Sequence, residues 1–211
     1  MTVTRPAAIL LAAGGGHRLG RDKQKLPWKG TSLLRHLAAE LAAIASPLLV
    51  ALPAGRRDLA RELDGLGAET VFPPSVETGI AGSLSLAARA LLARHGIEGV
   101  LVALVDQPLA SRDLFTELDR AARGGSGWAA CDYGEGGWGV PARFPATALP
   151  ELVKLTGDRG ARPLLETARG RGELALVPFP GGRFDVDTEE DYARLVELAG
   201  GAVPGGGEPS G

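Results

Sequence analysis

A short segment near the start of the chain combines glycines with clustered cations. An apolar run over residues 7–13 leads into three glycines at 14–16, and Lys23, Lys25 and Lys29 follow. Glycine lets backbone N–H groups approach an anion closely, and the lysines supply countercharge. Elsewhere the chain has one lysine and relies on arginine for positive charge. The pattern predicts a phosphate-binding loop that follows a buried strand.

This loop lacks the spacing of the two best-known phosphate motifs. Gly14 and Gly16 are not followed by a third glycine three residues later, as in dinucleotide-binding folds, and the pattern GxxxxGK[ST] is absent. A basic, solvated turn without a ligand is the alternative interpretation. A secretion signal is not expected, because the apolar run is short and leads into charged residues.

Carboxylates in the second half of the chain could hold a metal ion. Asp106 follows the aliphatic run 100–105, which is typical of a strand buried on both faces, and open α/β sheets bind ligands where such strands end. Asp187 is the expected second carboxylate, with Asp185 as the alternate. Mg²⁺ is bound through one or two carboxylates and substrate phosphates, so a magnesium site is predicted. Turn capping by Asp106 and helix-start chemistry at Asp187 are the alternatives.

The order of several motifs resembles one family, the MobA-like nucleotidyltransferases, and especially the molybdenum-cofactor cytidylyltransferases. The resemblance spans residues 8 to about 196. The opening signature LAAG-x3-R-x-G-x2-K is specific to the family. Each later motif is a weak indicator by itself, but their occurrence in the family's order supports the resemblance. The matching residues are Leu11 to Gly14, Arg18, Gly20 and Lys23, then Gly79 with Ser83-Leu84, Asp106-Gln107-Pro108, Gly139-x-Pro141, Gly157-Asp158-x-Gly160-Ala161-Arg162 and Asp185-x-Asp187-Thr188.

The resemblance implies a role for each motif. Arg18 would bind the β- and γ-phosphates, Lys23 would stabilise charge at the α-phosphate, and these two with Asp106 would be the catalytic residues. Gly79 and Ser83 would bracket the nucleobase or ribose, although Ser83 could simply cap a helix. The implied nucleotide site comprises Leu11, Ala12, Ala13, Gly14, Gly15, Gly16, Arg18, Lys23, Gly79 and Ser83, and the implied metal ligands are Asp106 and Asp187.

The acceptor side departs from the family pattern at one position. Val140 stands between Gly139 and Pro141, where relatives often carry His, so only the backbone turn is expected to serve an acceptor there. Asp158 and Arg162 could orient the acceptor, or they could form an internal ion pair at a helix start. Lys25, where relatives usually carry Leu, is either an auxiliary cation or a surface residue.

Composition favours a single α/β domain in a reducing compartment. The chain has 211 residues, a net charge of −2 and one cysteine, Cys131, expected to be buried filler. A nucleic-acid or membrane surface is not expected, and no apolar run approaches the ~18 residues of a membrane span. Trp28 and Trp138 are expected to pack rather than stack on a base. A cytoplasmic location is predicted, with residues 1–199 as the domain and 200–211 as a disordered Gly/Pro-rich tail.

Apolar runs alternate with helical periodicity, which predicts a Rossmann-like three-layer αβα domain with a mostly parallel sheet, the nucleotidyltransferase (GT-A-like) fold. Thr188 is the expected N-cap of the last helix. The expected strands are 7–13, 47–52, 69–72, 100–105, 128–130, 140–144 and 174–177. One expected helix begins near Leu33. The other expected helices cover 56–66, 82–94, 147–155, 161–169 and the segment from 188 to 198.

The resemblance implies a Mg²⁺-dependent transfer from CTP to a phosphorylated pterin, molybdopterin or its molybdenum-loaded form, with release of pyrophosphate. Guanylyl transfer from GTP, or transfer to another small phosphorylated acceptor, is the first alternative. The second is a non-catalytic cofactor-binding chaperone for molybdoenzyme maturation. A molybdoenzyme or its chaperone is also a candidate for transient contact. CTP is expected because cytidylyl enzymes tend to carry LAAG where guanylyl enzymes carry LAGG, and this chain has Ala13 there.

Overall fold

Helices pack on both faces of one seven-stranded sheet. The computed structural model describes residues 5–14, 19–74 and 79–198. The strands of the main sheet are β1 (Ala7–Leu11), β4 (Leu48–Ala51), β5 (Ala68–Val71), β6 (Gly99–Leu104), β7 (Trp128–Gly134), β8 (Gly137–Pro145) and β9 (Leu174–Pro178); β2 (Pro27–Trp28) and β3 (Thr31–Ser32) form a separate ribbon.

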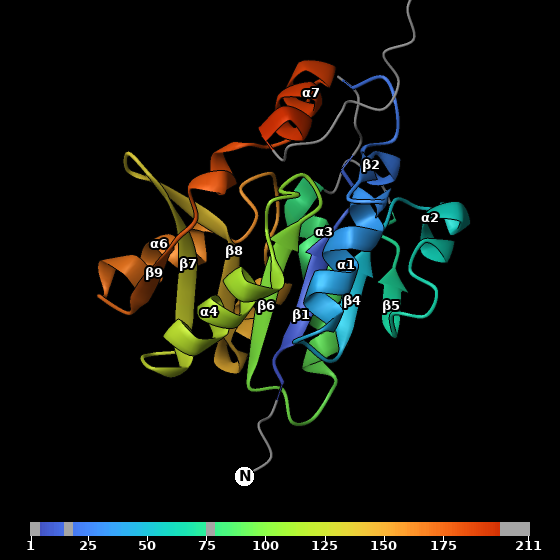
Figure 1. Cartoon of the computed structure of the whole chain (residues 1–211). Coiled ribbons are helices and arrows are strands. Elements are labelled where there is room, and N and C mark those ends of the chain that lie inside the picture. The colour runs from blue at the N-terminus through green and yellow to red at the C-terminus, as the bar shows by residue number, and fades with distance from the viewer. Residues whose placement is uncertain (1–4, 15–18, 75–78, 199–211) are drawn as a thin grey trace, which may run out of the picture.

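The sheet order is β5-β4-β1-β6-β8-β7-β9, with β5 and β9 at opposite edges (Figure 1). Neighbouring strands are parallel except where β8 is involved, since β8 runs antiparallel to both β6 and β7. The mostly parallel α/β sheet expected from the sequence is confirmed.

Most of the α-helices form two layers, one on each face of the sheet. One layer lies on the face visible at the front of Figure 1 and contains α1 and α4; the other contains α3, α5 and α6. The α-helices are α1 (Leu33–Ala42), α2 (Arg57–Arg61), α3 (Gly79–Leu92), α4 (Arg112–Arg123), α5 (Leu149–Val153), α6 (Arg162–Gly170) and α7 (Glu189–Leu198); 3-10 turns are η1 (Lys23–Lys25), η3 (Ala146–Ala148) and η4 (Pro180–Arg183).

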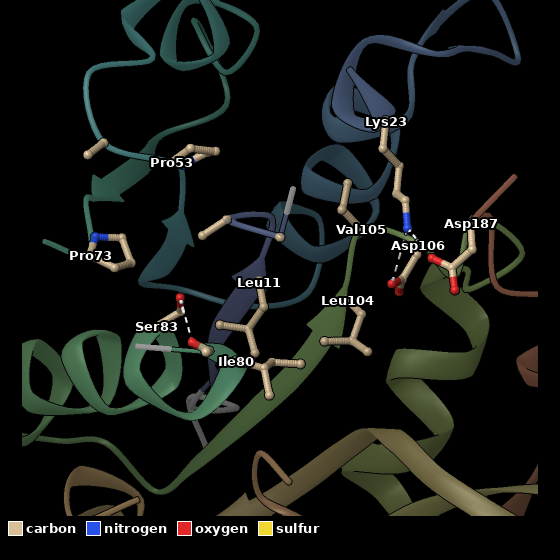
Figure 2. A pocket seen from close by; sticks show the side chains of 14 residues that line it. Leu11, Lys23, Pro53, Pro73, Ile80, Ser83, Leu104, Val105, Asp106 and Asp187 are labelled. Atoms are coloured by element: carbon tan, nitrogen blue, oxygen red, sulfur yellow. Dashed lines mark hydrogen bonds and ion pairs between the residues drawn. The ribbon is translucent and has the colours of Figure 1, made fainter. Parts of the chain in front are cut away.

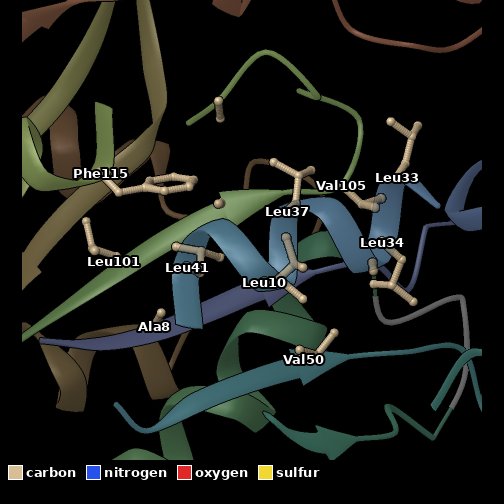
Figure 3. Close-up of a cluster of buried hydrophobic side chains, with 14 of the residues drawn as sticks. Ala8, Leu10, Leu33, Leu34, Leu37, Leu41, Val50, Leu101, Val105 and Phe115 are labelled. Carbon is tan, nitrogen blue, oxygen red and sulfur yellow. The ribbon is translucent and has the colours of Figure 1, made fainter. Parts of the chain in front are cut away.

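Strand β1 shows how the two layers are held. Ala8 and Leu10 point to the α1 side, whereas Ala7, Ile9 and Leu11 point to the α3 side, and all five are buried. On the α1 side, Leu10 packs with the leucines of α1 (Figure 3). Successive side chains of a strand alternate between faces, so a strand buried on both sides reads as the continuous apolar run seen in the sequence.

Several predicted boundaries need correction. The first strand ends at Leu11 rather than Ala13, which leaves Ala12 and Ala13 in the loop that follows. The helix predicted over 56–66 ends at Arg61, ahead of turns at Gly65 and Gly67, where φ is positive. The strand predicted over 128–130 extends to Gly134, across two register shifts in its pairing with β8.

Helix α4 was missing from the sequence prediction, although its signals are present. Ser111 is the N-cap, and its side chain accepts a 3.4 Å hydrogen bond from the backbone N–H of Leu114. Leu114, Phe115 and Leu118 form a narrow buried face in an otherwise charged segment. The narrow apolar stripe explains the omission, because most of the helix surface is polar.

The order of the strands creates a switch point between β1 and β6. The chain moves from β1 outward to β4 and β5, then returns to place β6 on the other side of β1. Leu11 and Leu104, the last residues of these two strands, are paired neighbours. Open α/β sheets bind ligands beyond the carboxyl ends of strands at such a point.

Candidate active site

A cavity of about 260 Å³ opens at the switch point between β1 and β6. Lys23, Asp106 and Asp187 lie at one end, and Pro53, Pro73 and Ser83 lie across from them (Figure 2). Residues from distant parts of the chain therefore face one space. Its lining comprises Leu11, Ala13, Gly14, Lys23, Pro53, Ala54, Pro73, Gly79, Ile80, Ser83, Leu104, Val105, Asp106 and Asp187.

Lys23 forms ion pairs with two carboxylates at this end of the cavity. Its Nζ lies 2.7 Å from Asp187 Oδ1 and 3.6 Å from Asp106 Oδ2. The lysine is only 7% exposed and belongs to the 3-10 turn η1, in which Gln24 is buried as well. A buried ammonium requires close anionic partners, and the two carboxylates supply them.

Asp106 reaches the cavity because β6 ends two residues earlier, at Leu104. The backbone carbonyl of Asp106 accepts a 3.0 Å hydrogen bond from the N–H of Val186. This backbone contact brings Asp187 beside Asp106. The helix that follows is capped as the sequence predicted: Thr188 Oγ1 accepts a 3.1 Å hydrogen bond from the N–H of Asp191, whose carboxylate accepts one from the N–H of Thr188.

Helix α7 is held over the segment that contains Lys23. Arg21 forms a bidentate ion pair with Glu189, at 2.5 and 2.6 Å, and its guanidinium lies over the Tyr192 ring. The Tyr192 hydroxyl donates a 2.6 Å hydrogen bond to the carbonyl of Pro27. The lysine and the second carboxylate are thereby attached to elements that contact one another.

Burial controls the charge of the acidic cluster. Desolvation raises the pKa of Asp106 above its usual value, while the Lys23 ammonium acts in the opposite direction. Burial, together with repulsion from Asp106 and Asp187, raises the pKa of Asp185 to about 6. Bringing a cation close to these carboxylates would favour their ionised forms.

The residues present fit a magnesium ion that is completed by substrate oxygens. Asp106 Oδ1 is buried and has no hydrogen-bond partner among the described residues, so it is available as an oxygen ligand beside Asp187. Within residues 5–14, 19–74 and 79–198, no cluster of three or more Asp, Glu, His or Cys side chains could by itself hold a metal. Two carboxylates plus phosphate oxygens are the arrangement that Mg²⁺ adopts in nucleotide sites.

Gln24 holds the residues that directly follow β1, a role that the sequence analysis missed. Its side chain is 3% exposed, and Nε2 donates hydrogen bonds to the carbonyls of Ala12, at 2.7 Å, and Gly14, at 3.3 Å. Ala13 lies between these two residues and lines the cavity. Gln24, the residue after Lys23, therefore fixes the backbone on both sides of Ala13.

Gly79 lines the cavity at a position where only glycine fits. Its φ is +63°, and a Cβ there would lie 2.4 Å from Asp158 Oδ1 and 2.9 Å from the carbonyl of Gly157. Ser83 also faces the cavity, but it lies inside α3 and its hydroxyl donates a 3.4 Å hydrogen bond to the Gly79 carbonyl. The alternative that Ser83 caps the helix is therefore wrong.

A second cavity of about 200 Å³ adjoins the first, and both are lined by Leu11, Ile80 and Leu104. Pro141, which the resemblance also assigned to the acceptor, is not among the lining residues, whereas Gly139, Asp158 and Arg162 are. The full lining comprises Leu11, Ile80, Leu84, Val102, Leu104, Tyr133, Trp138, Gly139, Val140, Asp158, Arg159, Gly160, Ala161, Arg162 and Leu165.

Arg162 is held by neighbours other than Asp158. Its Nη1 donates a 2.9 Å hydrogen bond to the carbonyl of Trp138, its guanidinium lies 4.6 Å from the centre of that indole ring, and Nε lies 3.1 Å from Glu166. The structure shows no ion pair between Asp158 and Arg162 among the described residues, so that alternative is wrong. Trp138 is 7% exposed and packs, as expected.

Tyr133 and Gln107 connect the second cavity to the carboxylate end of the first. The Tyr133 hydroxyl donates a hydrogen bond to the carbonyl of Val140, and Gln107 Nε2 lies 3.5 Å from that hydroxyl oxygen. Gln107 is buried and directly follows Asp106. Burial raises the pKa of Tyr133 to about 12, so the phenol remains a hydrogen-bond donor at neutral pH. The sequence signal for Gln107 was its place in the Asp106-Gln107-Pro108 motif; Tyr133 had none.

The structure also bears on the expectations for Lys25 and Cys131. Lys25 forms a 2.7 Å ion pair with Asp58 and does not line either cavity, which identifies it as a surface residue. Cys131 is buried, and desolvation raises the pKa of its thiol. Gly15, Gly16 and Arg18, together with the tail 200–211, lie outside the described residues.

Comparison with known proteins places this chain in a family. The model of the MobA-like NTP transferase domain matches residues 8–173. The chain belongs to the MobA-like nucleotidyltransferases. Among its relatives, purine catabolism protein PucB of Bacillus subtilis is 31% identical, with 87% of this chain and 92% of that protein covered. Molybdenum cofactor guanylyltransferase of Pseudomonas putida is 32% identical, over 81% of this chain and 80% of that protein.

Solved structures agree with this membership. Rv0371c of Mycobacterium tuberculosis superposes with a TM-score of 0.77 and 30% identity, covering 93% of this chain and all of that one, and another of its structures is a complex with manganese. The 2-C-methyl-D-erythritol 4-phosphate cytidylyltransferase of Thermus thermophilus gives 0.63 and 25%, covering 92% and 98%. The expected nucleotidyltransferase fold is confirmed. No described helix has the length and apolarity to cross a membrane.

Proposed function

We propose that this MobA-like nucleotidyltransferase transfers a cytidylyl group from CTP to the terminal phosphate of molybdopterin or its molybdenum-loaded form. An oxygen of the acceptor phosphate attacks the α-phosphorus of CTP, the bond to the bridging oxygen breaks, and pyrophosphate leaves. The observation that carries the proposal is the convergence of Lys23, Asp106 and Asp187 on one cavity at the switch point.

The donor nucleotide is proposed to occupy the first cavity. The peptide groups of the loop beginning at Gly14 and the side chain of Arg18 would bind the triphosphate, and Lys23 would stabilise charge that develops at the α-phosphate. The reaction brings two anions together, so catalysis depends mainly on neutralising charge and positioning the reactants.

Asp106 and Asp187 are proposed to hold a magnesium ion against the phosphates. Bound there, the ion would neutralise phosphate charge and orient the α-phosphate for attack. The unpartnered Oδ1 of Asp106 supports this assignment, as does the manganese complex of the Mycobacterium tuberculosis relative. Asp185 is the alternate ligand, and burial raises the pKa of its carboxyl group to about 6.

The acceptor is proposed to occupy the second cavity. Tyr133 and Trp138 give it an aromatic, largely apolar wall, and Arg162 and Asp158 add charge at its border. A flat heterocycle that carries a phosphate matches this combination of surfaces. Leu11, Ile80 and Leu104 line both cavities, so donor and acceptor would meet above the ends of β1 and β6.

The nucleobase preference is proposed from Ala13. This residue lines the donor cavity, so its methyl group occupies space that a glycine would leave for a larger purine. One methyl group corresponds to about 1–3 kcal/mol, or roughly 10- to 200-fold in selectivity. Guanylyl transfer is the second candidate, because the Pseudomonas putida relative carries the name of a guanylyltransferase.

Pyrophosphate release tests the proposal. Purified protein with Mg²⁺ would be assayed with each of the four NTPs and with acceptors that include molybdopterin, other phosphorylated pterins and sugar 1-phosphates. We expect release with CTP and molybdopterin, and the Ala13→Gly variant should narrow the preference for CTP over GTP without inverting it. Predominant use of GTP by the unmodified protein would establish guanylyl transfer. No release with any pair would favour a non-catalytic cofactor-binding chaperone.

A further inference from the structure

Lys23 and a divalent cation would compete for the same two carboxylates. The ammonium lies 2.7 Å from Asp187 and 3.6 Å from Asp106, and it is almost entirely removed from solvent. We infer that Lys23 opposes metal binding until a nucleoside triphosphate offers its ammonium other anionic partners, so that metal and nucleotide bind synergistically. The inference rests on the metal site of the proposed function and is independent of the acceptor and the base.

The charges around Lys23 explain the competition. Asp106, Asp185 and Asp187 form an acidic cluster, and Lys23 is the cation that contacts two of its members. An ion that takes the Asp187 oxygen bound to Lys23 must displace the ammonium. An ion that uses the remaining oxygens, including Asp106 Oδ1, comes to rest within a few ångströms of a positive charge. In both arrangements Lys23 weakens the affinity for the metal.

A triphosphate changes this balance because it provides new partners for both cations. Lys23, Asp106 and Asp187 line one cavity together with Gly14, so phosphate oxygens in that cavity lie within reach of the ammonium and of the metal position. Once Lys23 contacts a phosphate, Asp187 is released to bind the metal. Thermodynamic linkage then requires the metal to strengthen nucleotide binding by the same factor by which the nucleotide strengthens metal binding.

The test is a titration with Mn²⁺, followed by the electron paramagnetic resonance signal of the free ion. It compares the unmodified protein with Lys23→Met, which keeps the length of the side chain and removes its charge. Without nucleotide, Lys23→Met should bind Mn²⁺ about tenfold more tightly, or more. Adding the non-hydrolysable α,β-methylene analogue of CTP should strengthen Mn²⁺ binding strongly in the unmodified protein and much less in the variant.

Two matched variants separate charge from other effects. Lys25→Met removes a neighbouring lysine of the same turn, one that pairs with Asp58, and should leave the Mn²⁺ affinity unchanged. Lys23→Arg keeps the charge and should retain the weak binding. If Lys23→Met does not fold, as judged by near-ultraviolet circular dichroism, Lys23→Gln provides the neutral side chain.

The outcomes separate this inference from the proposed function. Asp106→Asn should abolish the tight Mn²⁺ binding of Lys23→Met; binding that is insensitive to Asp106→Asn would refute the metal site itself. If Asp106→Asn abolishes binding but the neutral Lys23 variants bind Mn²⁺ no more tightly than the unmodified protein, the metal site stands and the competition is refuted.

Discussion

The backbone N–H of Val186 donates a 3.0 Å hydrogen bond to the carbonyl of Asp106. This contact joins two segments about 80 positions apart and places Asp187 next to Asp106, with Lys23 between them. Because a backbone hydrogen bond fixes the spacing, the separation of the two carboxylates does not depend on flexible side chains alone. The candidate active site is therefore built into the fold at the end of β6.

Replacing Gln24 by Met should weaken nucleotide binding. The substitution keeps the length of a buried side chain but removes the donor to the carbonyls of Ala12 and Gly14. Leaving these carbonyls without partners should cost about 1–3 kcal/mol of folding stability and raise the KM for the nucleotide by about tenfold.

Urea unfolding and steady-state kinetics measure these two effects. Lys25→Met, on the same 3-10 turn but paired with Asp58 at the surface, is the control and should change both quantities little. An unchanged nucleotide KM in a well-folded Gln24→Met variant would show that the loop is organised by other contacts.

Replacing Gly79 by Ala should destabilise the fold and distort the donor cavity. The new Cβ would lie 2.4 Å from Asp158 Oδ1 and 2.9 Å from the backbone of Gly157, in addition to the penalty for a positive φ. Gly96→Ala is a matched control, because Gly96 has φ +76° and open space around the added methyl.

We expect Gly96→Ala to lose about 1 kcal/mol of unfolding free energy, the backbone cost alone, and Gly79→Ala to lose about 2 kcal/mol more, because the backbone of the 157–158 turn must shift. Equal losses in denaturant unfolding would indicate that the 157–158 turn adapts freely.

Removing the Tyr133 hydroxyl should affect the acceptor and spare the nucleotide. Tyr133→Phe leaves the aromatic wall in place but removes the hydrogen bond to the carbonyl of Val140 and the contact with Gln107. The acceptor KM should rise about tenfold, corresponding to one hydrogen bond of roughly 1.4 kcal/mol, while the nucleotide KM and kcat change far less.

Tyr192→Phe provides the comparison. It also removes a phenol that donates to a backbone carbonyl, that of Pro27, but it lies outside the acceptor cavity and should leave the acceptor KM unchanged. An equal rise of the acceptor KM in both variants would show that the Tyr133 hydroxyl acts through the stability of the fold and not through the acceptor cavity.

Much of the first half of the fold follows from local patterns in the sequence. Strands such as Gly99–Leu104 are buried on both faces, so their apolar runs are unbroken and their ends can be located within one or two residues. Helix α4 was missed because only one narrow stripe, including Phe115, is apolar. The antiparallel placement of β8 was not predictable, because strand order depends on contacts between distant segments.

The candidate site was likewise predictable from the sequence only in part. Lys23 and Asp106 could be identified from their motifs, because Lys23 belongs to a cluster of lysines after a glycine loop and Asp106 directly follows an aliphatic run. Gln24 and Tyr133 could not, because their importance depends on which backbone carbonyls lie opposite them in space. Those partners become known only when the loop after β1 and strand β8, which carries Val140, are placed.

Turnover of the Asp106→Ala variant at saturating Mg²⁺ tests the central claim most directly. The substitution removes the half-buried carboxylate proposed to hold the metal against the phosphates. The chain around it should remain folded, because the side chain is not part of the buried core. We predict a loss of about 100-fold or more in kcat, in line with the loss of preorganised charge stabilisation. A folded Asp106→Ala protein that turns over at close to the unmodified rate would contradict the account.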